Sequence, residues 1–393
     1  MGTLSSSINP GIHRITKGPG FHWFAYYDKL QFDPSMRYAL GMAVDFEHRS
    51  PAADDVIRVG MIDLQDGNRW IDLGTSRAWC WQQGCMLQWR PGSTSEVLWN
   101  DRQEDRFVCH ILDVQTGHRR TLPHPVYAVS PDGKIAVVTD FRRIQHMYPG
   151  YGYAGLPDPF EEDLAPECSG IYRLNLETGA AEMIINIAEV AAQPYLRADL
   201  RPAKHYFNHL LVSPDGRRFI FLHRWLFPGQ NRQSEFGTRM LTANLDGSEV
   251  HVVDDFGYTS HFIWRDPGHI LAWAYHPSHG ERFYLYEDAA NEVTVTGKDA
   301  MTRNGHCSYL SGGQWILNDS YPGEDGKQDL YLYHVLNDRK VILGRFDSPP
   351  AYRGEWRCDL HPRSSPDGRL VTIDSVHEGL GRQIYLLPIE EYL

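Results

Sequence analysis

Four histidines occupy the same position relative to a turn that recurs along this sequence. Each lies five or six residues before the Pro or Gly of such a turn, and together they are His209, His261, His306 and His361. Imidazole is a common metal ligand, and its neutral form is a general base near neutral pH. The shared position predicts that these side chains gather into one cluster that binds a metal ion or accepts a proton.

The last of these histidines has two further metal-binding residue types beside it. Cys358, Asp359 and His361 stand just ahead of the turn Ser365-Pro366-Asp367-Gly368. Thiolate, carboxylate and imidazole groups all bind divalent ions. We expect His306 and His361 to be metal ligands, helped by Asp359 or Cys358. Other roles stay open for these two helpers, because a buried thiol can be inert and a carboxylate can orient a histidine.

Seven turn motifs divide the sequence into units that could position these side chains. Their central residues are 40 to 83 residues apart and are Pro34, Pro91, Pro131, Pro214, Pro267, Gly312 and Pro366. Runs typical of strands follow the turns, such as Phe219-Ile220-Phe221-Leu222. Repeats of about 40–50 residues with several strands each are typical of β-propeller blades. The sequence therefore predicts an all-β, seven-bladed β-propeller with four-stranded blades, forming a single domain over residues 1–393.

Two features of this propeller depart from a simple repeat. The last unit ends with no residues left for a fourth strand, so we expect the N-terminal run Ile12-His13-Arg14-Ile15 to supply it. That pairing would close the ring and remove an exposed sheet edge. The longest interval contains Gln145 to Ser169, rich in Tyr, Pro and Gly, which reads as an ordered loop over one face.

The propeller geometry predicts where the remaining basic residues lie. Inner strands start at one end of the axis, and the loops between second and third strands open at that same end. These loops and strand starts bring nine more basic residues to the histidine cluster: Arg142, Arg143, His146, His223, Arg224, Arg239, His276, His279 and His377. A histidine cluster with arginines around it suits a metal and a carboxylate ligand. Tyr151, in an aromatic run of the long loop, either packs the loop or stacks on a sugar.

Composition limits the classes of partner. The chain of 393 residues has a net charge of -12 and no Lys/Arg block, which argues against a nucleic-acid partner. There is no apolar run long enough for a membrane span and no signal-peptide pattern at the start. The six cysteines form no C-x-x-C pair. We expect a cytoplasmic protein; the oligomeric state does not follow from the sequence.

Several short motifs, in their order and spacing, resemble those of the oligogalacturonate lyases. The motifs are Thr238-Arg239-Met240, Asn244-Leu245-Asp246-Gly247-Ser248, Ser260-His261-Phe262-Ile263-Trp264, Gly305-His306-Cys307 and His361-Pro362-Arg363-Ser364-Ser365-Pro366-Asp367. That family consists of seven-bladed propellers that bind manganese and cleave uronate oligosaccharides by β-elimination. The resemblance is strongest from His209 to Asp367.

This resemblance implies a role for individual residues. His261 falls on the general base, Arg239 on the arginine that binds the substrate carboxylate, and His306 and His361 on metal ligands. The chain departs from the family where a Gln-x-x-His-x-His ligand run is replaced by Trp356, Asp359 and His361.

The chain is also similar to the propeller ulvan lyases, which carry zinc and pair an arginine with a tyrosine and a histidine. His223 precedes Arg239 by 16 residues, similar to that tyrosine–arginine spacing, and His146 is a counterpart of their histidine. The resemblances therefore imply His261, Arg239, His223 and His146 as the catalytic set, and manganese or zinc as the metal.

The chemistry of uronate elimination agrees with this inventory. Removing a proton next to an ionised carboxylate builds negative charge, which a cation and an arginine stabilise, while a neutral histidine acts as base. The predicted function is a metal-dependent lyase acting on an anionic, uronate-containing oligosaccharide, with His209, Arg224, Arg143 and Tyr151 contacting the substrate. Two alternatives stay open. One is a non-catalytic propeller that binds a glycan or protein at its histidine-rich mouth, and the other is a glycoside hydrolase using Asp101 and Asp319.

Overall fold

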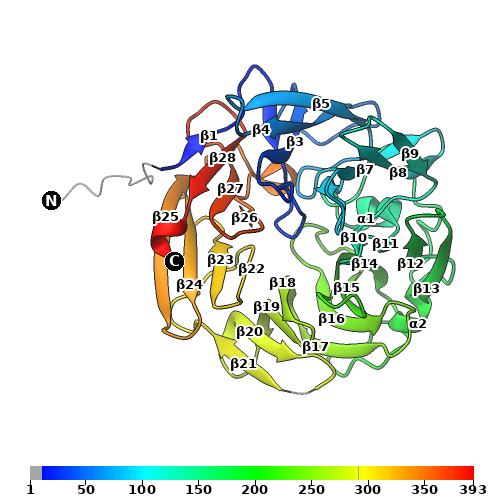
Figure 1. Cartoon of the computed structure of the whole chain (residues 1–393). Coiled ribbons are helices and arrows are strands. Elements are labelled where there is room, and N and C mark those ends of the chain that lie inside the picture. Colours follow the sequence, from blue (N-terminus) through cyan, green and yellow to red (C-terminus); the bar gives the residue numbers. More distant parts are fainter. Residues whose placement is uncertain (1–10, 291) are drawn as a thin grey trace.

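The computed structural model describes residues 11–290 and 292–393. In these residues seven four-stranded antiparallel sheets form a ring, in which the innermost strand of each sheet lies near the axis (Figure 1). The prediction of a seven-bladed β-propeller is confirmed. None of the helices in the described part of the chain is long and apolar enough to cross a bilayer.

Blades 1 to 4 follow one another along the chain, each from its inner to its outer strand. Their strands are β2 (Phe21–Trp23), β3 (Tyr38–Val44), β4 (Ile57–Asp63) and β5 (Arg69–Ser76); β6 (Gln88–Trp89), β7 (Glu96–Gln103), β8 (Arg106–Asp113) and β9 (Arg119–Leu122); β10 (Ala128–Val129), β11 (Ile135–Thr139), β12 (Gly170–Asn175) and β13 (Ala181–Asn186); and β14 (Lys204–Val212), β15 (Arg218–Leu226), β16 (Gly237–Asn244) and β17 (His251–Gly257).

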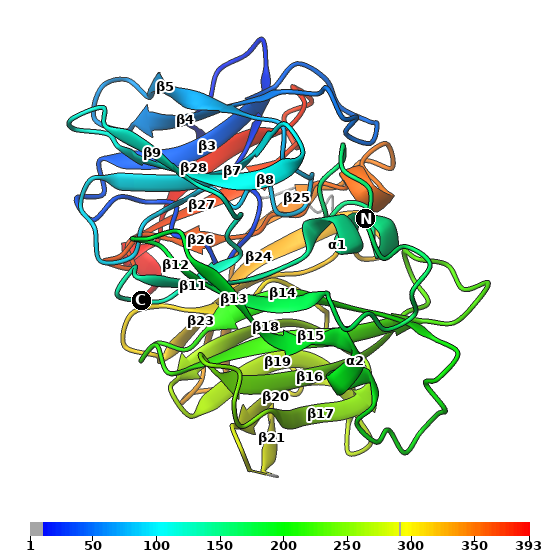
Figure 2. The ribbon, with the colours of Figure 1, turned by 90° about the vertical axis from the view of Figure 1, so that its right-hand side faces the viewer.

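Blades 5 to 7 complete the ring. Their strands are β18 (Thr259–Asp266), β19 (His269–His276), β20 (Gly280–Glu287) and β21 (Val293–Thr296); β22 (Ser308–Tyr309), β23 (Trp315–Asp319), β24 (Lys327–His334) and β25 (Arg339–Asp347); and β26 (Arg363–Ser364), β27 (Leu370–Ser375), β28 (Gln383–Pro388) and β1 (His13–Arg14). The helical elements are α1 (Phe141–Met147), α2 (Ile187–Ala191) and the 3₁₀ turns η1 (Gly354–Trp356) and η2 (Glu390–Tyr392). In Figure 2, α1 lies on the side of the ring from which the longest loops project.

The turn between the first and second strands of a blade is held by its own side chains. In blade 3 the Ser130 hydroxyl donates to the Asp132 carboxylate at 2.6 Å and accepts the Ile135 N–H at 3.0 Å. Gly133 follows with a positive φ of 68°, a conformation that costs glycine little. Equivalent hydroxyl–carboxylate pairs start at Ser213 in blade 4 and Ser365 in blade 7. This local chemistry sets the repeat seen in the sequence.

The ring is closed by pairing the two ends of the chain. His13 lies opposite Leu386 and Arg14 opposite Tyr385 in an antiparallel pair (Figure 1). Ile15, the next residue, is fully buried and donates its N–H to the Ile384 carbonyl at 3.0 Å. The predicted fourth strand of the last blade is confirmed, and its register covers the edge of β28.

Deleting residues 1 to 17 should therefore destabilise the whole propeller. The deletion exposes the β28 edge and removes the buried Ile15 side chain, a loss of several kcal/mol in the free energy of unfolding. Chemical denaturation monitored by tryptophan fluorescence measures the change. Unfolding that is the same in the full and the shortened chain would contradict this account of ring closure.

The axis of the ring is occupied by the segment that follows β2. The Tyr27 hydroxyl donates to the Phe262 carbonyl at 2.7 Å and accepts the Phe262 N–H at 3.0 Å. On the opposite side the Asp374 carboxylate accepts the backbone N–H groups of Phe24 and Ala25. The segment thus links blades 1, 5 and 7, and the tyrosine rings form the floor beneath one mouth of the propeller.

The long loop after α1 is ordered by the buried guanidinium of Arg143. Arg143 forms an ion pair with Asp158 at 3.0 Å and donates to the carbonyls of Phe160, Asp163 and Leu164. The expected ordered loop is present. Its anchor is Arg143, whose donor groups are engaged in holding it.

Candidate functional site

A cavity of about 400 Å³ opens at the mouth to which the histidine positions point. Blades 4 to 7 and two long loops contribute its walls, which include Tyr148, Tyr151, Asn208, His209, Arg224, Phe236, Tyr258, His261, Asn304, Tyr321 and Arg357. The wall carries aromatic rings, side-chain amides and guanidinium groups, and imidazoles lie at its base. A concave site with a few convergent polar groups of this kind suits a polar small ligand.

The four histidines meet at the bottom of this cavity, where His209 and His261 line it and His306 and His361 pack beneath His261. The ring centroids of His261 and His306 are 4.0 Å apart, and those of His306 and His361 are 4.1 Å apart. His209 reaches the group through Tyr26, whose ring centroid lies 5.0 Å from His209 and 5.5 Å from His361. The structure therefore brings together four side chains from blades 4, 5, 6 and 7.

Two of these histidines and the neighbouring Asp359 form a set that could hold a metal ion. Donor atoms of His306, Asp359 and His361 all lie within 4.8 Å of one another, and all three side chains are buried. The Nε2 atoms of His306 and His361 are buried and have no hydrogen-bond partner in the described part of the chain. Burying such polar atoms is costly unless something binds them. Two imidazoles and a carboxylate fit a divalent ion of the zinc or manganese type.

Asp319 orients both histidines of this set. Its carboxylate accepts the backbone N–H groups of His306 at 2.6 Å and His361 at 3.1 Å. It also lies 2.9 Å from Nδ1 of His306, which places the proton on Nδ1 and leaves the Nε2 lone pair free. Gly305 permits this approach, because a Cβ there would lie 2.0 Å from the Asp319 carbonyl oxygen. The sequence had offered Asp319 only as an acid for glycoside hydrolysis.

Cys358 does not join the metal-binding set. Its thiol is buried, and burial raises its pKa to about 12. The group of potential ligands found in the described residues contains its neighbour Asp359 and not Cys358. Of the two helpers left open by the sequence, the geometry favours the carboxylate.

His261 is a neutral imidazole that lines the bottom of the cavity. The Asn304 amide donates to Ser260 at 3.1 Å, so its oxygen faces His261 and accepts from Nδ1–H at 3.0 Å. Nε2 therefore keeps its lone pair, 3.5 Å from the Tyr321 hydroxyl. Burial, together with the neighbouring His306, holds the pKa of His261 well below its ordinary value. The imidazole is thus neutral near pH 7.

His209 is held by hydroxyl groups on both ring nitrogens. Its Nδ1 lies 3.2 Å from the Tyr26 hydroxyl, and its Nε2 lies 3.4 Å from that of Tyr27. Burial lowers its pKa to about 4. His209 thus lines the cavity as a neutral imidazole, with the buried Asp28 carboxylate 3.6 Å from its Nε2.

Arg357 is a member of the site that sequence reasoning missed. Its Nε donates to Asp359 at 2.7 Å, and another guanidinium N–H donates to the Tyr151 hydroxyl at 2.6 Å. Tyr151 in turn stacks on Tyr148 with ring centroids 4.5 Å apart. The arginine therefore connects the Asp359 carboxylate to the long loop that carries Tyr148 and Tyr151. Its position directly before Cys358, Asp359 and His361 is the sequence feature that could have pointed to it.

Neither a protein-family model nor a curated protein sequence matches this chain. Among solved structures, an oligogalacturonate lyase in complex with manganese superposes with a TM-score of 0.68 at 15% identity, covering 97% of this chain and 93% of that one. An oligogalacturonate lyase from Vibrio parahaemolyticus gives 0.65 at 15% identity, covering 97% and 94%. This chain has a similar fold. The tricorn protease also superposes, at 0.50 and 14% identity, over 96% of this chain and 35% of that one.

Two residues that the lyase resemblance implied as catalytic lie away from the cavity. Arg239 is 1% exposed and donates to Nδ1 of His223 at 3.0 Å and to the carbonyls of Val190 and Pro194. His223 contacts Nδ1 of His205 at 2.9 Å on its other side. Neither side chain lines the cavity. Their bonds tie β15 and β16 to the segment around α2.

His146 and the two carboxylates considered for glycoside hydrolysis also lie elsewhere. His146 lines a separate cavity with Lys204, whose Nζ is 3.3 Å from its Nε2. Asp101 pairs with His110 in blade 2 at 3.1 Å, while Asp319 holds His306 in blade 6. Neither acid lines the histidine cavity, so the structure offers no support for a carboxylate pair across it.

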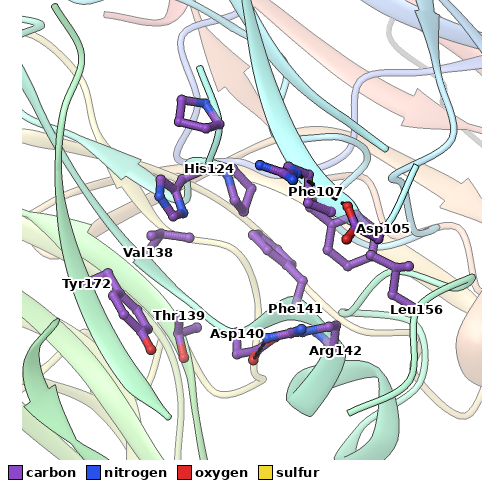
Figure 3. A pocket seen from close by; sticks show the side chains of 13 residues that line it. Asp105, Phe107, His124, Val138, Thr139, Asp140, Phe141, Arg142, Leu156 and Tyr172 are labelled. Atoms are coloured by element: carbon purple, nitrogen blue, oxygen red, sulfur yellow. Dashed lines mark hydrogen bonds and ion pairs between the residues drawn. The ribbon is translucent and has the colours of Figure 1, made fainter. Parts of the chain in front are cut away.

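A second cavity, of about 350 Å³, lies at blades 2 and 3 (Figure 3). Its apolar wall includes Phe107 and Phe141, and Arg142 at its rim donates to Asp140 at 2.9 and 2.7 Å. That arginine is already neutralised by its neighbour. None of the four clustered histidines lines this cavity, so the candidate site is the one above them.

Proposed function

We propose that this protein is a metal-dependent lyase that cleaves uronate-containing oligosaccharides by β-elimination. The observation that carries the proposal is the pair of unpartnered Nε2 atoms of His306 and His361 beside Asp359, with the neutral His261 in ring contact with His306. Such a site has both a place for a cation and a base. The fold shared with oligogalacturonate lyases supports the same reaction class.

His306, His361 and Asp359 would hold a divalent ion, with manganese or zinc as the best match to two imidazoles and a carboxylate. When bound, such an ion supplies Lewis-acid stabilisation for the negative charge that grows on a uronate carboxylate. The Arg357 guanidinium, between Asp359 and Tyr151, adds positive charge at the same wall. The residues of this chain therefore favour an anionic transition state.

The elimination itself needs a base and a proton donor. His261 Nε2 takes the proton from the carbon next to the carboxylate, and the electron pair forms the new carbon–carbon double bond as the adjacent glycosidic C–O bond breaks. The leaving oxygen needs a proton, and the Tyr321 hydroxyl lies 3.5 Å from His261 Nε2. Burial raises the pKa of Tyr321 well above its ordinary value, so this hydroxyl keeps a proton to donate.

A direct assay tests the proposal. The protein is incubated with Mn²⁺ or Zn²⁺ and with pectic, ulvan or glucuronan oligosaccharides, and the absorbance of a new unsaturated uronate is recorded. We expect product from at least one of the three polymers. Tight binding of a saccharide without any product would instead support a non-catalytic glycan-binding propeller.

A further inference from the structure

Arg224 is a buried cation without a counter-charge. The residue is 6% exposed, and among the described residues its Nε has no hydrogen-bond partner and no carboxylate forms an ion pair with it. Tyr206, opposite Arg224 in the β14–β15 pairing, has a neutral hydroxyl and supplies no counter-charge. Its guanidinium lies over aromatic rings, 4.4 Å from the Phe236 centroid and 5.6 Å from that of Tyr148. A buried charge normally has a partner, because its desolvation is expensive. Here the open side of the guanidinium is the cavity that Arg224 lines.

The two arginines of this cavity differ in a way that separates their roles. Arg357 already has the Asp359 carboxylate and the Tyr151 hydroxyl as partners. Each guanidinium contacts a different ring of the stacked tyrosine pair, Arg224 at 5.6 Å from the Tyr148 centroid and Arg357 at 5.8 Å from that of Tyr151. Arg224 is therefore a second positive centre of the cavity, separate from the arginine that pairs with Asp359.

A second unpartnered polar atom lies beside Arg224. Asn208 lines the same cavity from β14, the strand that pairs with β15, and its buried Oδ1 has no hydrogen-bond partner among the residues that the structure describes. Because an amide can present either its oxygen or its N–H₂ group, Asn208 can donate to an oxyanion or accept from a sugar hydroxyl. The Arg224 guanidinium and the Asn208 amide can both bond to one oxyanion, and the aromatic rings can contact the sugar ring that carries it.

We propose that Arg224 and Asn208 form an anion subsite that binds a carboxylate or a sulfate ester of an acidic sugar, next to the sugar whose bond is broken. The identification of the ligand as a sugar rests on the proposed function. The inference that the ligand is an anion does not depend on that function, because it follows from the unpaired buried charge of Arg224. The subsite gives the cavity its preference for a saccharide that carries a second acidic group.

The experiment measures binding to metal-free protein, in which no substrate is consumed. Isothermal titration calorimetry compares trigalacturonate, its methyl ester, and a neutral trisaccharide with and without a sulfate ester. Arg224→Met keeps the apolar stem and removes the charge. Arg217→Met, an arginine 84% exposed on the same blade, is the matched control.

Arg224→Met should weaken binding of the preferred acidic saccharide roughly 10- to 100-fold, as expected for a charge-assisted contact. Binding of its uncharged counterpart should not change, and Arg217→Met should bind like the original protein. A loss confined to trigalacturonate identifies the carboxylate as the ligand, and a loss confined to the sulfated sugar identifies the sulfate. Unchanged affinity in Arg224→Met would overturn the subsite.

Thermal unfolding provides a second, independent readout. Removing an unpaired buried charge should leave Tm unchanged or raise it, because the charge is kept for binding at a cost in stability. A lower Tm in Arg224→Met than in Arg217→Met would assign Arg224 to the fold and overturn the proposal. Lyase activity is measured separately, so a protein that binds acidic sugars through Arg224 without cleaving them contradicts only the proposed function.

Discussion

Replacing His306 and His361 together by alanine should abolish stoichiometric metal in protein washed free of loosely bound ions. The double change removes two of the three residues whose donor atoms lie within 4.8 Å of one another. Asp359 alone, already paired with Arg357, cannot hold a divalent ion tightly. Metal content by plasma mass spectrometry is the primary measurement. A full equivalent retained in the double variant would place the metal elsewhere.

Thermal unfolding with and without added Mn²⁺ or Zn²⁺ gives a readout that needs no activity. An ion that binds the folded state raises Tm, because it stabilises that state by an amount that grows with the logarithm of the ratio of its concentration to Kd. We expect this rise in the original protein and none in the double variant. Asp319→Asn should lie between them, with roughly 10- to 100-fold weaker metal binding, because it only orients His306 and His361. Equal metal affinity in Asp319→Asn would contradict that orienting role.

His261→Ala should lower kcat by roughly 10²- to 10⁴-fold while metal content stays at the original level. The loss follows from removing the Nε2 lone pair that Asn304 keeps free. The metal survives because His261 lies beside the ligand set without belonging to it. Steady-state kinetics with the saccharide found in the lyase assay, together with metal analysis, separates the two roles.

The matched control for the base is His276→Ala. His276 is partly exposed at the end of β19 and contacts Ser278 at 2.7 Å, so its loss should change neither kcat nor metal content. If His261→Ala loses the metal, the residue is a ligand, and the base must be sought at His209. Full activity with full metal content in His261→Ala would contradict the role of His261 as the base.

The sequence by itself determined the propeller and the position of its histidines. The turn at Ser130 is built from bonds within six residues, so its signature survives in the sequence wherever the turn recurs. The N-terminal strand followed from counting strands in the last unit, because a ring leaves no edge unpaired. Convergence of His261, His306 and His361 followed from their shared place before the turns, since equivalent positions in a ring face the same axis.

Only the tertiary structure decided which basic residues reach the cavity. His223 and Arg224 are neighbours on β15, and successive side chains of a strand point to opposite faces. His223 lies opposite Arg239 in the β15–β16 pairing, so these two share one face and bond to each other. Arg224 takes the other face and the cavity. The register of β14 shifts between Asn208 and Leu211. The alternation of side chains along a strand therefore does not predict which face these residues occupy.

Asp319, Arg357 and Tyr321 required the fold for a similar reason. Asp319 ends β23 and reaches backbone N–H groups of His306 and His361, which are 13 and 42 residues away in the chain. Arg357 lies in an irregular stretch before β26, where no periodic pattern assigns a direction to a side chain. Sequence spacing records local bonds and shared registers. Contacts between blades depend on how neighbouring sheets pack, and only the assembled ring fixes that.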